Sequence, residues 1–152
     1  MLKFTALPTP LPQNHLHEPT TLLEPVTSAN SFPCRRCLRD GTPGEHMLLL
    51  SYNPFPTDSP ASGSPYAGPG PIYVHQQPCT PYQCDGSVPE QQRRRLLAVR
   101  AYDRDCMMVD FAVVSGEELE GKAGELLVKD GVSFLHVYYA GPGCFAVRID
   151  RV

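Results

Sequence analysis

Two short stretches of the sequence carry the side chains that most often bind zinc. Cys34 and Cys37 are separated by two residues, and His75 and Cys79 follow about 40 residues later. Thiolates and imidazoles are the usual zinc donors, and a two-residue gap lets both thiolates of such a pair reach one ion. The four residues therefore predict a Cys₃His zinc site, with buried thiols that bind no metal as the alternative.

The same cysteine pair could instead form a redox-active dithiol. Arg35 and Arg36 lie between the two cysteines, and nearby positive charge lowers the pKa of a thiol and favours the thiolate. Dithiols of the thioredoxin type, however, lie where a strand meets a helix. The stretch Phe32-Pro33-Cys34 instead follows a proline-rich segment without a strand pattern, so the sequence favours a metal site over a thiol oxidoreductase.

A second group of polar side chains falls on strands predicted nearer the C-terminus. Strand alternation places four of them on one face of an antiparallel sheet, namely Arg100, His136, Tyr138 and Arg148. Such a face could bind an anion or supply a general acid or base in a small-molecule enzyme. The catalytic candidates are Arg100, His136 and Arg148, and the candidate ligand-binding residues are Arg35, Arg100, Tyr138, Cys144 and Arg148.

The simpler interpretation of this polar face is the solvent side of the sheet, because antiparallel sheets often have one solvated face. Cys144 and Ala146 would share that side with Arg148. The opposite, core-facing residues of the same strand would be Phe145, Val147 and Ile149. The sequence favours this solvent-face interpretation over a binding face.

Charge and motifs exclude several classes of function. A net charge of -3 provides no concentrated basic surface for nucleic acid. The sequence has no phosphate-binding glycine loop and no G-x-S-x-G or H-E-x-x-H motif, so we expect no nucleotide cofactor. No apolar run approaches the roughly 18 residues of a membrane span, and the N-terminus lacks the apolar core of a secretory signal. We therefore expect a soluble, cytoplasmic protein with reduced cysteines.

Apolar periodicity predicts an α+β fold, made mainly of antiparallel sheet with one main helix. Strands are predicted at residues 46–52, 72–75, 96–102, 107–114, 132–140 and 144–151. Two S-x-x-E capping boxes begin at Ser87 and Ser115, and each should start a helix. The second helix carries the longer apolar stripe and ends at Gly131. The C-terminal half is thus a strand-strand-helix-strand-strand unit.

Prolines mark the expected domain organisation. Fifteen of the 17 prolines precede Gln83, and each fixes φ and removes a backbone donor. We therefore expect a loop-rich N-terminal half, in which residues 1–31 form an extended arm, followed by a single α+β domain over residues 32–152. Residues 54–71 are rich in Pro, Gly and Ser and predict a long surface loop that could cover the polar face as a lid.

The chain contains the segments FPCRRCLRDGTPGEHMLLLSYNPF, SPYAGPGPIYVH, LAVRAYDRDCMMVD and GCFAVRIDRV. Over roughly residues 30–152 it thereby resembles the family called domain of unknown function (DUF) 1203. The matching motif residues are Pro33, Cys34, Arg35, Gly44, Glu45, Arg100, Asp103, Gly143, Cys144, Arg148 and Arg151. The resemblance implies one folded unit and carries over no catalytic residue. Many members of that family have serine in place of Cys37 and lack the pair His75 and Cys79, which implies that zinc would be an addition within a subgroup.

Overall fold

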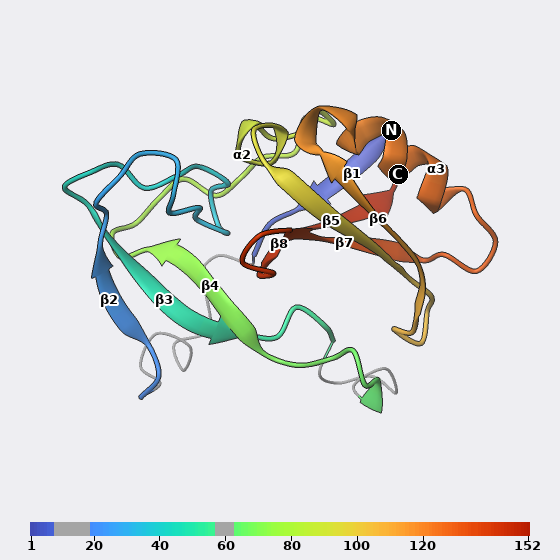
Figure 1. Cartoon of the computed structure of the whole chain (residues 1–152), viewed down its shortest axis with the longest axis horizontal. Helices are drawn as coiled ribbons and strands as arrows, with labels where there is room; N and C mark the ends of the chain where they lie inside the picture. The colour runs from blue at the N-terminus through green and yellow to red at the C-terminus, as the bar shows by residue number, and fades with distance from the viewer. Residues whose placement is uncertain (8–18, 57–62) are drawn as a thin grey trace.

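The computed structural model describes residues 1–7, 19–56 and 63–152, so parts of the predicted arm and of the predicted loop 54–71 lie outside the described residues. Five strands form one sheet: β1 (Leu2–Thr5), β5 (Leu96–Tyr102), β6 (Met108–Ser115), β7 (Phe134–Tyr139) and β8 (Phe145–Arg151). Three more form a second sheet: β2 (Leu22–Pro25), β3 (His46–Tyr52) and β4 (Gly70–His75). The sheet orders are β1-β8-β7-β5-β6 and β2-β3-β4, and every pairing between these strands is antiparallel (Figure 1). The predicted α+β class is confirmed.

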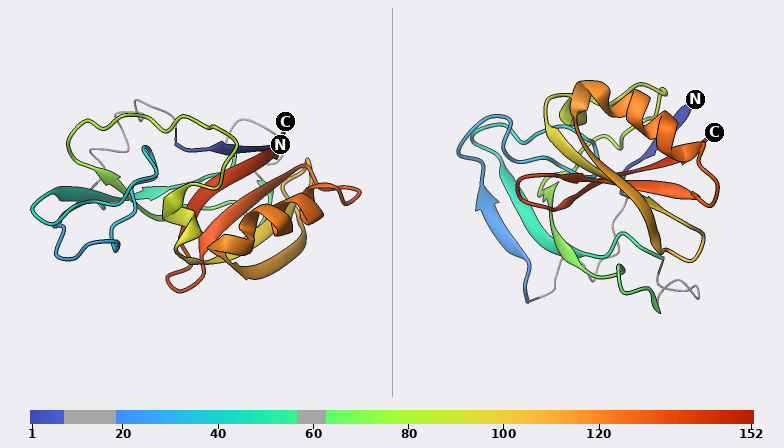
Figure 2. Two further views of the ribbon diagram at one scale, coloured as in Figure 1. Left: turned by 90° about the horizontal axis from the view of Figure 1, so that it is seen from above. Right: turned by 45° about the vertical axis from the view of Figure 1, so that its right-hand side comes forward.

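One face of the five-stranded sheet is covered by helix α3 (Leu119–Leu127), as both views of Figure 2 show. The predicted apolar stripe of this helix is buried, and it consists of Leu119, Ala123, Leu126 and Leu127. Opposite it lie Leu97, Val99 and Ala101 of β5, which are fully buried in the same core. Burial of each large aliphatic side chain stabilises the fold by about 1.5–3 kcal/mol. No helix in the described parts of the chain is long and apolar enough to cross a membrane.

The main helix begins at the capping box that the sequence predicted. Glu118 Oε2 accepts hydrogen bonds from the Ser115 hydroxyl at 2.8 Å and from the Ser115 backbone N–H at 3.1 Å. A short 3₁₀ turn, η2 (Gly116–Glu118), then leads into α3. Position 116 requires glycine, because a Cβ there would lie 2.0 Å from the carbonyl oxygen of Gln92. This contact fixes the start of the main helix against the preceding short helix.

That short helix, α2 (Glu90–Arg93), forms where it was expected, but the capping box predicted at Ser87 is wrong. Pro89 is the N-cap residue of α2 and offers no side-chain acceptor. The Ser87 hydroxyl and backbone N–H instead donate to Asp85 Oδ1, at 2.6 and 2.9 Å. A carboxylate two residues earlier in the chain forms a local turn of this kind and competes with the helix cap.

Two strands lie within the segment expected to form an arm. β1 pairs with β8, with Phe4 opposite Ile149, and β2 pairs with β3, with Leu22 opposite Leu49. Phe4 is only 2 % exposed and belongs to the core beneath α3. Both strands therefore dock at sheet edges through partners that lie far away in the sequence.

The face of the five-stranded sheet opposite α3 is not a solvent face, so the favoured interpretation of the polar residues is wrong. The three-stranded sheet lies on this side (Figure 1), and His136 is fully buried there. A β-bulge between Val137 and Tyr138 shifts the register of β7 against β8. Phe145 consequently pairs with Tyr138 on the polar face, whereas Ala146 faces the core beneath α3. The sides predicted for these two residues are therefore wrong as well.

Candidate metal centre

The first two predicted zinc ligands lie in a tight turn. Pro33 and Asp40 form an antiparallel bridge at its base, with Cys34 and Cys37 between them. The Leu38 N–H donates to the Cys34 carbonyl oxygen at 3.1 Å, and Leu38 itself has a left-handed φ of 54°. This conformation is unfavourable for a leucine, but it folds the chain back so that both thiols approach one point. We call residues 33–40 the cysteine turn.

The other two predicted ligands are brought to the cysteine turn by strand β4. Cys34 forms a parallel bridge with Tyr73 of β4, and the Arg35 N–H donates to the Tyr73 carbonyl oxygen at 3.0 Å. His75 is the last residue of β4, and Cys79 follows in the next loop. The turn and the strand end therefore lie side by side, although about 40 residues separate them.

All four predicted ligands converge. Their donor atoms lie within 4.8 Å of one another. Cys34 Sγ is 4.0 Å from Cys79 Sγ, and Cys37 Sγ is 3.6 Å from His75 Nδ1. Ligands that lie about 2.3 Å from a tetrahedral zinc ion are about 3.8 Å from one another. The group therefore fits zinc both in its donor atoms and in its spacing.

Neighbouring side chains orient the imidazole and one sulfur. His75 Nε2 lies 3.5 Å from Glu45 Oε2, which leaves Nδ1 to face the thiols. A carboxylate behind a metal-bound imidazole fixes the ring and raises its basicity. Thr42 donates to the same carboxylate through its backbone N–H at 2.7 Å and its hydroxyl at 3.1 Å, and these bonds lower the pKa of Glu45. Arg36 donates to Cys79 Sγ at 3.3 Å.

Hydrogen bonds within the group favour a thiolate. The pKa of Cys34 is lowered, chiefly because the Cys37 thiol donates a hydrogen bond to its sulfur. The same contact, together with burial, raises the pKa of Cys37. The pKa of His75 is raised because the Cys34 sulfur stabilises the charged imidazole, against the opposing effect of burial. These shifts favour the thiolate form of Cys34, which is the form of cysteine that binds metal ions.

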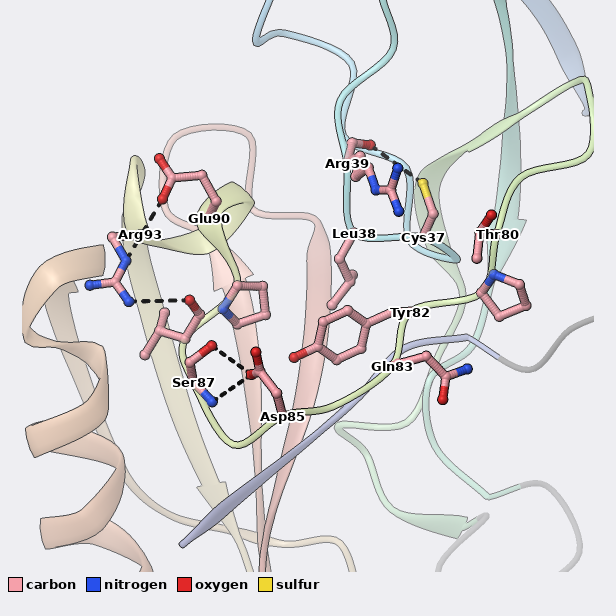
Figure 3. Close-up of a pocket in the computed structure, with 13 residues that line it drawn as sticks. Cys37, Leu38, Arg39, Thr80, Tyr82, Gln83, Asp85, Ser87, Glu90 and Arg93 are labelled. Carbon is pink, nitrogen blue, oxygen red and sulfur yellow. Dashed lines mark hydrogen bonds and ion pairs between the residues drawn. The ribbon is translucent and has the colours of Figure 1, made fainter.

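A cavity of about 530 Å³ lies beside the group, and Cys37 forms part of its wall. Figure 3 shows the Cys37 sulfur turned toward the carbonyl oxygen of Arg39, at 3.9 Å. Cys37 is nevertheless only 5 % exposed, and Cys34 is fully buried. The cavity gives small molecules room near the cluster but leaves its sulfurs largely covered.

The family described as "Protein of unknown function (DUF1203)" matches residues 31–151. The chain belongs to the DUF1203 family. This DUF1203 match includes the cysteine turn, strands β3 to β8 and helix α3, and it confirms the resemblance seen in the sequence. No curated protein and no solved structure matches the chain.

The predicted ligand-binding residues of the DUF1203 domain form two groups. In the first, Arg35 is 1 % exposed and donates to the carbonyl oxygens of Pro33 and Phe145 at 2.6 and 2.7 Å. It also donates to Cys144 Sγ at 3.0 Å, and the two residues line a cavity of about 360 Å³. These bonds attach the cysteine turn to the start of β8.

The second group lies on the polar face. Arg100, His136 and Arg148 are cross-strand neighbours on β5, β7 and β8. Arg100 and Tyr138 line a cavity of about 300 Å³, which neither His136 nor Arg148 lines. His136 has its pKa lowered to about 3 by burial and by the two arginines, while Arg148 pairs with Asp150 at 2.7 Å. The three catalytic candidates are therefore adjacent, but only Arg100 reaches the cavity.

Glu45 has no role that the sequence predicted, and the structure places it behind the imidazole of His75. A local signal was present, because Thr42 and Glu45 have the T-x-x-E spacing in which the carboxylate reaches back to a backbone N–H. That spacing indicates a fixed carboxylate but not its partner.

Proposed function

We propose that this DUF1203 domain is a metal-stabilised ligand-binding protein with a structural zinc ion. The proposed zinc ligands are Cys34, Cys37, His75 and Cys79. The proposal depends chiefly on one observation, the convergence of three sulfurs and one imidazole nitrogen within 4.8 Å. Four protein ligands fill the tetrahedral shell of zinc and leave no position for a substrate, as in structural sites. Zinc bound there would add folding free energy by joining the cysteine turn to β4.

Burial supports a structural metal over thiol redox chemistry. Disulfide exchange requires that a thiolate meet the sulfur of another molecule. Cys34 is fully buried and Cys37 is 5 % exposed, so both members of the cysteine pair are poorly placed for such an attack. A Cys34→Ser variant tests the alternative, since a thiol oxidoreductase would lose disulfide reduction activity and a zinc protein would have none to lose.

Native mass spectrometry of protein produced with zinc tests the proposal directly. We expect one zinc ion per chain in the wild type and none in Cys34→Ser or Cys79→Ser. Cys84→Ser is the matched control, because Cys84 is exposed and lies outside the cluster. A wild-type mass equal to that of the bare chain, with freely reactive thiols at Cys34 and Cys37, contradicts the proposal.

The polar face supports the ligand-binding part of the proposal. The cavity at Arg100 has aromatic and proline walls and a cation, which suits a small organic ligand. An enzyme acting on a small molecule is the second candidate function for the same face. Binding is favoured over acid–base catalysis because the one histidine of the face, His136, is buried and does not line this cavity.

A further inference from the structure

The cavity of about 300 Å³ lies between the polar face, the end of β3 and the segments that lead into β4 and into β8. Its walls include the rings of Tyr52, Phe55, Tyr66 and Phe145, and five prolines. This volume is at the lower end of the range for small-molecule sites, which are mostly apolar with a few placed polar groups. The walls therefore suit a compact ligand with an aromatic or aliphatic body.

Arg100 supplies the cavity with positive charge that is not neutralised. Its guanidinium lies 4.0 Å from the centre of the Tyr138 ring and forms no ion pair with a described carboxylate. None of the described residues that line the cavity is acidic. Arg148, in the same cross-strand row, is instead paired with both carboxylate oxygens of Asp150 at 2.7 to 3.0 Å. Of the two arginines in this row, Arg100 is therefore the one that has no carboxylate partner among the described residues.

His136, which lies between the two arginines, neither neutralises their charge nor adds a further positive charge. It is fully buried, and its Nε2 atom has no hydrogen-bond partner among the described residues. Burial and the two arginines keep the ring neutral, with the pKa lowered to about 3. A cation in partly apolar surroundings is stabilised by a bound counter-ion. The positive electrostatic potential at the cavity wall therefore favours a ligand with one negative charge.

We propose that this cavity binds a small organic carboxylate, with the carboxylate paired to Arg100 and the apolar body against the aromatic and proline walls. A planar guanidinium matches a carboxylate through two parallel hydrogen bonds. One free cation also matches a single negative charge better than the double charge of a phosphate monoester. The inference specifies the ligand class of the proposed ligand-binding function and is independent of the zinc site.

Titration of the zinc-replete full chain with 3-phenylpropionate, followed by NMR, tests this site. We expect saturable shifts at cavity residues and binding at least about tenfold weaker for the neutral analogue 3-phenylpropionamide, because charge-assisted hydrogen bonds are lost. Arg100→Gln should weaken binding of the carboxylate by a similar factor. Arg104→Gln, whose arginine side chain is 89 % exposed on the hairpin turn, should leave it unchanged.

Arg100→Lys retains the cation and should keep part of the affinity, which separates loss of charge from loss of fold. Zinc content is measured for every variant, so a failure of the metal site is seen independently of a failure to bind the anion. Equal affinity for carboxylate and amide, or undiminished binding by Arg100→Gln, overturns the proposal. The proposal is also overturned if the NMR spectra of the wild type show no saturable shifts. It is overturned as well if inorganic phosphate binds as tightly as the organic carboxylate.

Discussion

The two sheets of the molecule are held together by different means. In the described parts of the chain, sixteen buried apolar residues form the core in which the five-stranded sheet packs against α3. The second core, beneath the three-stranded sheet, has ten such residues among those described, and two of them are the cluster cysteines Cys34 and Cys37. Two others, Tyr138 and Phe145, belong to the larger sheet. The core of the smaller sheet thus has fewer described apolar residues and includes two candidate metal ligands, so we expect the stability of this sheet to depend more on the cysteine cluster.

If zinc occupies the cluster as proposed, its removal should affect the two sheets unequally. Structural zinc adds folding free energy where it joins chain segments, and local openings with few buried contacts cost least. In protein treated with a chelator, we expect amide hydrogen exchange in β3 and β4 to accelerate by about 100-fold or more, with little change in β5 and β7. Cys79→Ser should reproduce the pattern and Cys84→Ser should not. Uniform acceleration in both sheets contradicts a local role for the metal.

Acid should destabilise the polar face of the larger sheet through His136. Burial, Arg148 and Arg100 lower its pKa to about 3 in the folded protein, against about 6.5 in the unfolded chain. The stability that depends on neutral His136 is thus fully present above about pH 6.5 and is lost as the pH falls toward 3. The loss amounts to at most roughly 4–5 kcal/mol. Urea unfolding of His136→Phe should show a flatter fall between about pH 6.5 and 4 than the wild type, and equal slopes would falsify the assignment.

Arg35 links the two sheets directly, because it lies in the cysteine turn and donates to the Phe145 carbonyl oxygen of β8. In Arg35→Leu, this acceptor and the Pro33 carbonyl oxygen lose a buried donor. We expect the free energy of unfolding to fall by about 3 kcal/mol. Arg39→Leu, at an exposed position of the same turn, should change it by less than about 0.5 kcal/mol. Equal effects of the two substitutions on urea unfolding contradict the link.

The sequence predicted the elements whose patterns are local. The strand at residues 46–52 has the predicted bounds, and the hairpin of β5 and β6 lies within one residue of its predicted position. The four zinc-type ligands were also predicted from their types and spacing, and they converge. Donor chemistry is carried by the residues themselves, so that a short motif can reveal a candidate site before the fold is known.

What covers the polar face and how β7 pairs with β8 were not predicted correctly. The polar face was assigned to solvent because alternation shows which residues share a side but not what covers that side. The bulge that turns Phe145 toward His136 arises from the pairing of β7 with β8, and no feature of either strand alone marks it. The type and strand position of Arg100 are evident from the sequence, whereas only the three-dimensional structure shows that no described carboxylate pairs with it.

The two S-x-x-E patterns allow a small but well-matched test within the more stable part of the molecule. The capping box at the start of the main helix is complete. The Ser115 side chain accepts a hydrogen bond from the Glu118 backbone N–H, and the Ser115 backbone N–H donates one to the Glu118 carboxylate. Ser87 is bonded to Asp85 and makes no side-chain bond to α2. Ser115→Ala should therefore lower the free energy of unfolding by about 1 kcal/mol, as expected for loss of an N-cap, and Ser87→Ala by less than about 0.5 kcal/mol. Equal losses of unfolding free energy in the two variants, measured by urea unfolding, would contradict this difference in hydrogen bonding.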